Sequence, residues 1–238
     1  MFSYYGSKSK VIHFYPPPKN ELIIEPFAGS AQYALRYFAR EVILYDKYKI
    51  IVDLWNTLKA MSKKDILGLP PVVVGQNIDE LTTISTKERL VMGFMINQGT
   101  THACKKVSPW GVKSYNRTKS RIANSLHKIK HWKIHLESYE NIPNQDATWF
   151  IDPPYQFGGH KYSCSNRHID FYNLAMWSQS RKGQIIVCEN TKATWMDFTP
   201  LISQRGARYT TTEAIWTNLP SSITAQQIDL FDEFESQP

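Results

Sequence analysis

Short apolar runs rich in β-branched residues alternate along this chain with longer segments that have the spacing of amphipathic helices. The candidate strands are residues 21–25, 41–45, 132–136, 148–151 and 184–189. The candidate helices are residues 30–40, 48–61, 86–97 and 168–179. Strands that alternate with helices form mostly parallel sheets with helices packed on their faces. The pattern therefore predicts an α/β fold, and the segment "RYTTTEAIW" (208–216) predicts one more strand or hairpin.

The alternation lapses in the middle of the chain, where "GLPPVVVGQN" (68–77) interrupts it. The simplest organisation is an α/β core built from two halves of the sequence, with a separate lobe inserted between them. We predict a discontinuous core at residues 1–61 and 131–220, an inserted, mainly helical lobe at 62–130, and a flexible acidic tail at 221–238.

The net charge of +7 is unevenly distributed along the chain. The tail after residue 220 contains four acidic and no basic residues, so the rest holds 28 basic against 17 acidic side chains, a balance of +11. No acidic residue occurs between Arg89 and Leu136, and Trp110, Tyr115 and Trp132 lie among the basic residues of that stretch. A solvated basic face would explain the charge alone. Aromatic residues in an acid-free basic segment favour nucleic acid, because phosphate contacts release counterions. The residues expected to contact it are Lys105, Lys106, Lys113, Arg117, Lys119 and Arg121.

The segment "LIIEPFAGSA" (22–31) has the pattern of a strand, a tight turn and the start of a helix. In a doubly wound sheet, a nucleotide-like ligand binds at this turn, beyond the carboxyl end of the first strand. The turn contains one glycine, Gly29, where a dinucleotide site uses three to let the backbone approach a pyrophosphate. A ligand without phosphates, such as S-adenosylmethionine, fits that difference, and an ordinary strand–turn–helix is the alternative.

Asp46 ends the second candidate strand. It lies about as far past the glycine turn as an acidic side chain that accepts hydrogen bonds from ribose hydroxyls. Capping of the helix that begins near Tyr48 explains the same residue equally well, so the sequence leaves both roles open.

In "FIDPPY" (150–155) an apolar strand ends in Asp152, and two prolines and Tyr155 follow. The prolines have a fixed φ and no N–H, so the turn is stiff and offers acceptors without competing donors. The Asp152 carboxylate and the Pro153 carbonyl can converge on one –NH2 group while the Tyr155 ring stacks on a flat base. Two acceptors that hold the two hydrogens of the –NH2 group point the lone pair of its nitrogen outward. Positioning and electrostatics would then supply most of the catalysis of a direct group transfer to that nitrogen. A strand-terminal Asp before a proline turn is the structural alternative.

Five segments, taken in order, resemble the Dam-like adenine-specific DNA methyltransferases. They are "YYGSK" (4–8), "EPFAGSA" (25–31), Asp46, "FIDPPY" (150–155) and "RYTTTEAIWTN" (208–218). The resemblance covers nearly the whole chain except about residues 62–130 and the tail. It implies a Rossmann-like S-adenosylmethionine-dependent methyltransferase core with an inserted basic DNA-recognition lobe. The implied reaction is site-specific methylation of N6 of a flipped adenine in double-stranded DNA, as in restriction-modification systems.

The resemblance also implies roles at matching positions. Tyr4 and Lys8 would touch the cofactor, with Lys8 suited to its carboxylate, and Tyr139 would stack where the family often has an acidic-aromatic pair. The cofactor set is Tyr4, Lys8, Glu25, Phe27, Gly29, Asp46, Tyr139 and Asp152. The catalytic set that would hold the adenine is Asp152, Pro153 and Tyr155. We expect the loop "YQFGGHKYSCSNRH" (155–168) to close over the flipped base, with Gly158 and Gly159 as hinges.

Other features limit the alternatives. The chain has no apolar run of membrane-spanning length and no apolar signal segment, so we expect a cytoplasmic protein of a bacterium, archaeon or phage, and a monomer or weak dimer. The three cysteines form no C-x-x-C pair, and none has the context of an activated nucleophile. His127, His131 and His135 are spaced four apart, but "HWKIHLE" alternates like a strand with Trp132, Ile134 and Leu136 inward. We therefore expect no metal site.

The tail segment "QIDLF" (Gln227 to Phe231) resembles the short peptides that dock bacterial replication and repair proteins on the sliding clamp. An extended segment could place Leu230 and Phe231 in an apolar pocket, and an acidic terminus with chance hydrophobic residues is the alternative. Two rival functions also stay open. One is methylation of a cytosine amino group or of an RNA base, and the other is nucleic-acid binding by an inactive core.

Overall fold

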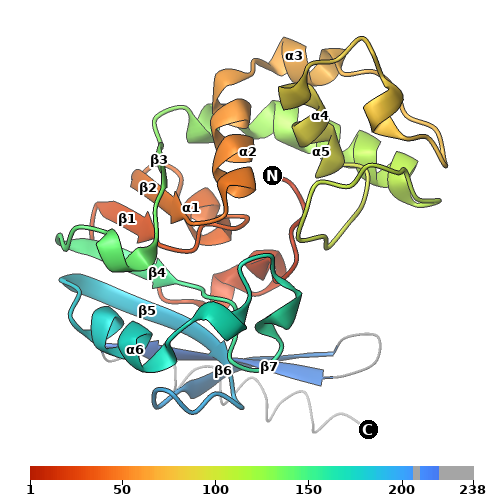
Figure 1. The fold of residues 1–238 in the computed structure, drawn as a ribbon. Helices are drawn as coiled ribbons and strands as arrows, with labels where there is room; N and C mark the ends of the chain where they lie inside the picture. The colour runs from red at the N-terminus through yellow and green to blue at the C-terminus, as the bar shows by residue number, and fades with distance from the viewer. Residues whose placement is uncertain (206–209, 220–238) are drawn as a thin grey trace, which may run out of the picture.

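The computed structural model describes residues 1–205 and 210–219, which form one seven-stranded sheet covered by helices (Figure 1). The strands are β1 (Leu22–Glu25), β2 (Glu41–Asp46), β3 (Lys133–Leu136), β4 (Ala147–Ile151), β5 (Gly183–Asn190), β6 (Thr199–Arg205) and β7 (Thr210–Thr217). Their spatial order is β3-β2-β1-β4-β5-β7-β6. The first five strands are parallel, and β7 runs antiparallel to both β5 and β6. The predicted α/β, Rossmann-like fold class is confirmed, and the strand order reverses between β1 and β4.

The helices are α1 (Gln32–Arg36), α2 (Lys49–Ala60), α3 (Lys63–Gly68), α4 (Thr86–Gly93), α5 (Gly111–Ser125) and α6 (Phe171–Gln179). Short 3₁₀ turns are η1 (Lys8–Lys10), η2 (Ile12–Phe14), η3 (Ile78–Glu80), η4 (Leu126–Ile129), η5 (Tyr139–Asn141), η6 (Gly159–Lys161) and η7 (Asn166–His168). In the region that the structure describes, none of the helices combines the length and apolar character of a membrane span.

Two hydrophobic clusters cover the two faces of the sheet. Neighbouring residues of β1 point to opposite faces of the sheet. Ile23 belongs to the cluster that includes α2 and the N-terminal segment, and Ile24 belongs to the cluster that includes α6. On β4 the buried Phe150 and Trp149 divide in the same way. A parallel strand with both faces covered needs apolar residues at every position, which explains why the central strands appear in the sequence as continuous apolar runs.

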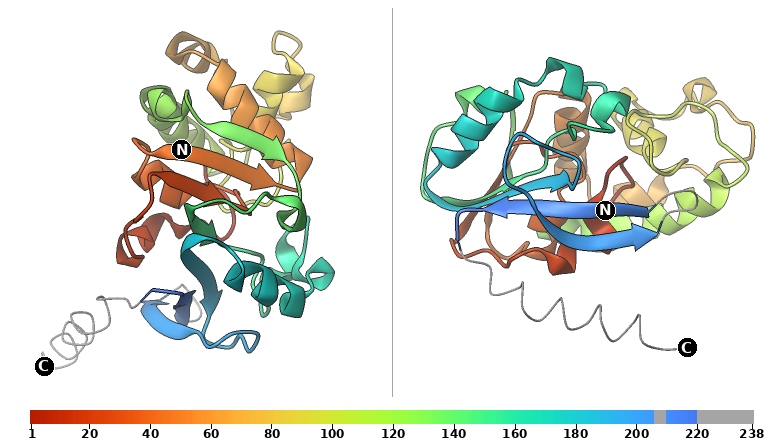
Figure 2. Two further views of the ribbon diagram at one scale, coloured as in Figure 1. Left: turned by 90° about the vertical axis from the view of Figure 1, so that its left-hand side faces the viewer. Right: turned by 90° about the horizontal axis from the view of Figure 1, so that it is seen from below.

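The segment between β2 and β3 is helical and projects beyond one end of the sheet (Figures 1 and 2). Two of its helices begin with capping boxes, in which the Ser62 and Ser85 side chains pair with the residues three positions on, Asp65 and Glu88. In α5 the buried positions recur at helical spacing, at Gly111, Ser114, Tyr115, Thr118, Ile122 and Ala123. The domain boundaries predicted from the sequence stay a prediction.

Two predicted helices are shorter than expected. The helix predicted at 30–40 is limited to Gln32–Arg36, because Ala31 before it adopts a left-handed backbone with φ +44°. The helix predicted at 86–97 ends at Gly93, where an added Cβ would lie only 2.8 Å from the Cβ of Ala103. The chain therefore turns at Gly93 to let the following loop pack against the helix.

The prediction that Leu136 points inward is wrong. Trp132 is fully buried, but Leu136 is 49% exposed. The reason is that β3 is an edge strand of the sheet, paired only to β2, so the last residue of β3 has no covering layer. The tail, including Gln227 to Phe231, lies outside the described residues.

Candidate functional site

A cleft lies beyond the carboxyl ends of β1, β2 and β4, where the strand order of the sheet reverses. It comprises two adjoining cavities with empty volumes of about 700 and 360 Å³. The larger cavity is lined by the predicted cofactor residues Tyr4, Phe27, Gly29, Asp46, Tyr139 and Asp152. The smaller one is lined by the other two predicted cofactor residues, Lys8 and Glu25. All eight residues are thus brought together at the switch point where α/β sheets bind ligands, and their individual roles stay predictions.

The turn after β1 forms one rim of the cleft and has an unusual backbone. Gly29 has φ +42° and is followed, two residues later, by Ala31 with φ +44°. A left-handed backbone is strained for a residue with a Cβ and persists where neighbouring contacts hold it. Here the Trp55 indole N–H donates to the Gly29 carbonyl at 2.9 Å, and the Ala28 N–H donates to the Tyr45 carbonyl at 2.9 Å. The turn is therefore held rigidly against α2 and β2.

Asp46 bridges the glycine turn and the start of α2. Its carboxylate accepts from the Gly29 N–H at 3.1 Å and from the Tyr48 N–H at 2.8 Å. Burial raises the pKa of Asp46 to about 6, although both N–H bonds act against the shift. Both sequence-based roles are compatible with this geometry, since each carboxylate oxygen accepts one bond here and can accept another, and Asp46 lines the larger cavity.

Glu25 lies deeper, at the end of β1. Its carboxyl group accepts from the Ala34 N–H in α1 at 2.7 Å, and burial raises its pKa to about 8. The group therefore holds a proton at neutral pH in the free protein. In that state it can donate a hydrogen bond as well as accept one.

Aromatic side chains form the opposite wall of the larger cavity. The rings of Phe27 and Tyr139 lie 5.5 Å apart, and Tyr139 packs edge-on against Trp177 at 5.2 Å. Burial raises the pKa of Tyr139 to about 12. A flat heterocycle fits between such a wall and the polar rim at Asp46, because apolar faces with a few fixed polar groups characterise small-molecule sites.

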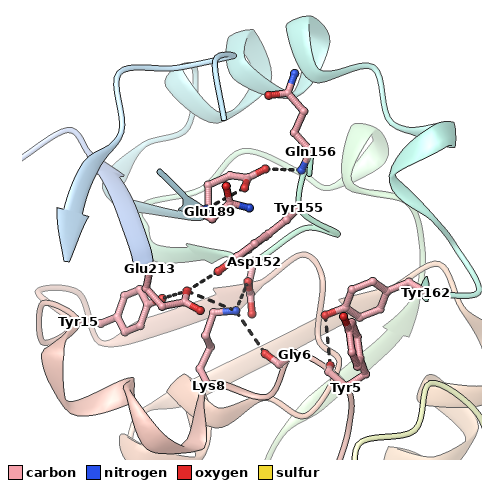
Figure 3. Close-up of polar contacts among 11 residues, drawn as sticks. Tyr5, Gly6, Lys8, Tyr15, Asp152, Tyr155, Gln156, Tyr162, Glu189 and Glu213 are labelled. Carbon is pink, nitrogen blue, oxygen red and sulfur yellow. Dashed lines mark hydrogen bonds and ion pairs between the residues drawn. The ribbon is translucent and has the colours of Figure 1, made fainter. Parts of the chain in front are cut away.

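The charged centre of the site is the ion pair between Lys8 and Asp152 (Figure 3). The Lys8 ammonium lies 2.9 Å from the Asp152 carboxylate, 3.3 Å from the Gly6 carbonyl and 3.9 Å from the Glu213 carboxylate. Burial alone would lower the pKa of Lys8, but the two carboxylates outweigh it and raise the pKa above its usual value. Burial also raises the pKa of Asp152, and the Lys8 charge opposes that shift. The side chain of Asp152 is 21% exposed, because it borders both cavities.

Tyr155 contributes its ring face and its hydroxyl to different neighbours. The Lys8 ammonium lies 4.6 Å from the centre of the ring, and the hydroxyl donates to the Glu213 carboxylate at 2.5 Å. Tyr15 donates to the same Glu213 oxygen at 3.1 Å. Of the two prolines, Pro154 lines the larger cavity and Pro153 is buried beside it. The predicted role of the Pro153 carbonyl stays a prediction.

Glu213 is a site residue that the sequence did not identify. It comes from β7, the antiparallel strand beside β5, and joins the N-terminal segment to the turn after β4 through its contacts with Lys8, Tyr15 and Tyr155 (Figure 3). The one available signal was a carboxylate in the centre of an otherwise uncharged strand segment, "TTTEAIWT" (210–217). Such a residue is buried only with partners, which here lie about 60 or more positions away.

The loop at residues 155–168 packs over the N-terminal segment and forms part of the cleft wall. The Tyr162 hydroxyl donates to the Tyr5 carbonyl at 3.2 Å, and its ring lies 5.2 Å from the ring of Tyr5. Gly158 has φ +106° and open space around it, as a hinge requires, whereas an added Cβ at Gly159 would lie 2.8 Å from the Pro154 backbone. Gly159 therefore serves close packing, and closure of the loop over a base stays a prediction.

The six lobe residues predicted to contact nucleic acid do not form one cluster. Lys113 and Arg117 line a groove beside the start of α5. Lys105 pairs with Asp79 at 2.8 Å, and Lys106 is exposed nearby. Arg121 donates to the Met1 carbonyl at 2.8 Å, and Lys119 donates to the Leu69 carbonyl at 2.5 Å.

His127, His131 and His135 each contact a different neighbour. His131 contacts the Arg40 carbonyl at 3.0 Å, and the His135 ring stacks on Tyr45. His127 packs edge-on against Phe38. Among the residues that the structure describes, no group of three His, Cys, Asp or Glu side chains has the arrangement of a metal site.

No protein-family model matches the chain, and no curated protein sequence matches it. Among solved structures, a protein of Escherichia coli provisionally described as a methyltransferase is 9% identical, with a TM-score of 0.34 over 87% of this chain and 78% of that one. A protein of Haemophilus influenzae provisionally described as a methylase is 14% identical, with a TM-score of 0.34 over 84% of this chain and 80% of that one. A conserved hypothetical protein of Streptococcus pyogenes is 10% identical, with a TM-score of 0.31 over 82% and 84%. Values this low assign no activity, so the functional conclusion depends on the geometry of the site.

Proposed function

We propose that the protein is an S-adenosylmethionine-dependent methyltransferase that methylates the exocyclic N6 of adenine in double-stranded DNA. Three features support the proposal: a ligand cleft at the switch point of the sheet, an acidic strand end followed by Pro-Pro-Tyr, and a basic stretch without acidic residues between Arg89 and Leu136. The ordered sequence motifs support it independently of the geometry.

The observation that carries the proposal is the position of the Lys8 ammonium. It donates to the Asp152 carboxylate at 2.9 Å and lies 4.6 Å from the centre of the Tyr155 ring. These are the two groups that would hold the amino group of an extruded base, by a hydrogen bond and by stacking. A nitrogen that donates to Asp152, here a charged ammonium, is therefore already bound there in the free protein, which supports a site able to accept hydrogen bonds from an –NH2 group.

Each residue of the cleft has a part in this chemistry. When bound, S-adenosylmethionine supplies an electrophilic methyl group on a sulfonium. The Phe27 and Tyr139 wall and the Asp46 carboxylate would hold its adenosyl part. Asp152 would accept a hydrogen bond from the amine of the target base and keep the developing positive charge on nitrogen stabilised until a proton leaves.

Lys8 must leave Asp152 before a base amine can take its place. Removing a buried charge from its partner is costly unless a second partner is within reach. Glu213 provides that partner, because its carboxylate already lies 3.9 Å from the Lys8 ammonium. We infer that Lys8 shifts from Asp152 to Glu213 when the base inserts, so that the ammonium stays paired throughout.

The target amine lies inside the duplex, so the base must be extruded. Flipping costs a few kcal/mol, while stacking on an aromatic ring returns roughly 1–3 kcal/mol and each hydrogen bond adds about 1 kcal/mol. These terms nearly balance. Phosphate contacts made by the basic lobe must therefore supply much of the net affinity for DNA.

The test is transfer of labelled methyl groups to duplex DNA, followed by nucleoside analysis of the product. We expect N6-methyladenine, and we expect Asp152→Asn to abolish transfer while leaving DNA retention intact. Asp53→Asn is the matched control, because Asp53 forms an exposed pair with Lys49 on α2, away from the cleft. Methylated cytosine or transfer to RNA alone would replace the proposed substrate. DNA retention without any transfer would identify a binding protein with an inactive core.

A further inference from the structure

A second open groove lies on the helical lobe, outside the cleft. It has an open volume of about 1000 Å³ and is lined by Asn97, Ser108, Trp110, Lys113, Ser114 and Arg117, among others. The lining contains two cations and no acidic residue. Lys113 and Arg117 are four positions apart on α5, so their side chains extend from the same face of the helix.

The amino-terminal end of α5 opens onto this groove. This helix of 15 residues has no side-chain cap at Trp110 and no acidic residue in its first turn. The first N–H groups of a helix have no intrahelical acceptor and carry partial positive charge. An uncapped helix start beside two cations is suited to an anion.

Ser114 gives an independent indication of a ligand. The residue is 4% exposed and lines the groove, yet its hydroxyl has no hydrogen-bond partner among the residues that the structure describes. An unpaired buried hydroxyl is destabilising by its desolvation. The hydrogen of a serine hydroxyl rotates about the Cβ–Oγ bond to suit its acceptor, so the Ser114 hydroxyl can donate to an anion that reaches it from the groove.

Trp110 forms an exposed wall of the same groove. Its side chain is 80% exposed, whereas Trp55, Trp132 and Trp149 are fully buried. An indole ring at the edge of a cationic groove can pack against the sugar or base that a phosphate carries. The groove thus combines anion-binding groups with an aromatic surface.

The loop beside the groove is hydrogen-bonded to the N-terminal segment that borders the cleft. Asn97 and Gln98 line the groove. The next residue along the chain is Gly99, whose N–H donates to the Ser3 hydroxyl at 3.0 Å. The Tyr5 N–H donates to the Thr100 carbonyl at 3.1 Å. Tyr5 borders the smaller cavity, and the loop runs toward the N-terminal segment in Figure 1. One duplex could therefore contact both places.

We propose that this groove binds a backbone phosphate of the DNA substrate, and that the nucleotide carrying it packs against Trp110. The α5 amino terminus, Lys113, Arg117 and the Ser114 hydroxyl hold the phosphate. The site deepens the proposed function and rests on it, because it positions the duplex while the base is held at Asp152. It contributes affinity without reading sequence, since phosphates are the same at every base pair.

The test is DNA binding by fluorescence anisotropy across a salt series, with a labelled adenine-containing duplex as the probe. Replacing both cations, Lys113→Gln with Arg117→Gln, should lower the magnitude of the salt slope by about 0.9, since the groove holds one phosphate and each phosphate contact contributes about that amount. The control is Lys63→Gln with Lys133→Gln, two exposed lysines outside the groove, which should leave the slope close to that of the wild type.

Ser114→Ala separates a ligand role from a packing role. We expect it to weaken DNA binding by about fivefold, as loss of one hydrogen bond would, with an unchanged or higher melting temperature. Ser120→Ala is the control on the same helix, since the Ser120 hydroxyl bonds only the Asn116 carbonyl, and it should bind DNA normally. If the groove variants keep wild-type affinity and slope while methyl transfer persists, the groove is refuted and the enzyme assignment stands. If the wild type neither binds DNA nor transfers methyl groups, both proposals fail.

Discussion

Replacing Lys8 by methionine removes the positive charge that pairs with Asp152 but keeps a side chain of similar length. In the wild type the ammonium lies 2.9 Å from the carboxylate and opposes the effect of burial on the pKa of Asp152. Without it, that carboxyl group has burial and the nearby Glu213 carboxylate acting together, and both raise the pKa. The variant should therefore need a higher pH to ionise Asp152.

The size of the shift follows from the distance. Two unit charges about 4 Å apart interact by about 4 kcal/mol at an effective dielectric constant of 20, which equals about three pKa units. Water reaches the 21% of the Asp152 side chain that is exposed, and it screens the interaction. We therefore expect the pKa of Asp152 to rise in the variant, by less than the unscreened loss of the Lys8 charge would produce.

The assay is the pH dependence of kcat/KM for methyl transfer, whose acidic limb reports the ionisation of groups in the free enzyme. The limb should move to higher pH in Lys8→Met and stay in place in Lys10→Met, which changes an exposed lysine of the same 3₁₀ turn. A lost contact to the cofactor carboxylate would instead raise the cofactor KM equally at every pH. An acidic limb that coincides in the two variants would refute the reasoning.

Three further predictions concern other residues. Burial raises the pKa of Glu25 from 4.5 to about 8, so between these pH values the folded state holds a proton that the unfolded state releases. The free energy of unfolding of the wild type therefore falls as pH rises from about 4.5 to 8. Glu25→Gln, measured by urea unfolding, should gain stability relative to the wild type over that window. Tyr155→Leu should raise the KM for DNA more than Tyr155→Phe, because only phenylalanine keeps a ring on which a base can stack; equal effects would argue against stacking. A labelled peptide of residues 221–238 should bind a bacterial sliding clamp, measured as a rise in fluorescence anisotropy, and Leu230→Ala with Phe231→Ala should abolish that binding. No rise in anisotropy on adding the clamp would reject docking.

The parallel strands could be predicted closely because their physical requirement is local. Each central strand is buried on both faces, so its apolar run ends within one or two residues of the observed strand, as at residues 148–151 against Ala147–Ile151. The residues that end these strands then meet at one edge of the sheet by topology alone. This explains why Glu25, Asp46 and Asp152 could be placed in one site from the sequence.

The elements that were missed lack such a local signal. In α5 the buried face includes Ser114 and Thr118, and the helix as a whole is polar and basic, so its few apolar residues did not identify it as a packed helix. In β6 the register shifts at Pro200, and the strand does not alternate. Both elements are stabilised mainly by tertiary packing against their neighbours, and this packing cannot be predicted from their local sequence.

The site was hard to predict for the same reason, because its paired charges come from residues far apart in the sequence. Lys8, Asp152 and Glu213 come from the N-terminal segment, the end of β4 and the centre of β7, and one ammonium serves two carboxylates. An empty binding site would leave Asp152 buried without a partner, which is costly. In the structure the Lys8 ammonium fills that role. Under the proposed function, the substrate amine takes its place and Glu213, 3.9 Å from the ammonium, keeps the lysine paired. The proposal therefore assigns both the stability of the free protein and the recognition of an amino group to the same carboxylate.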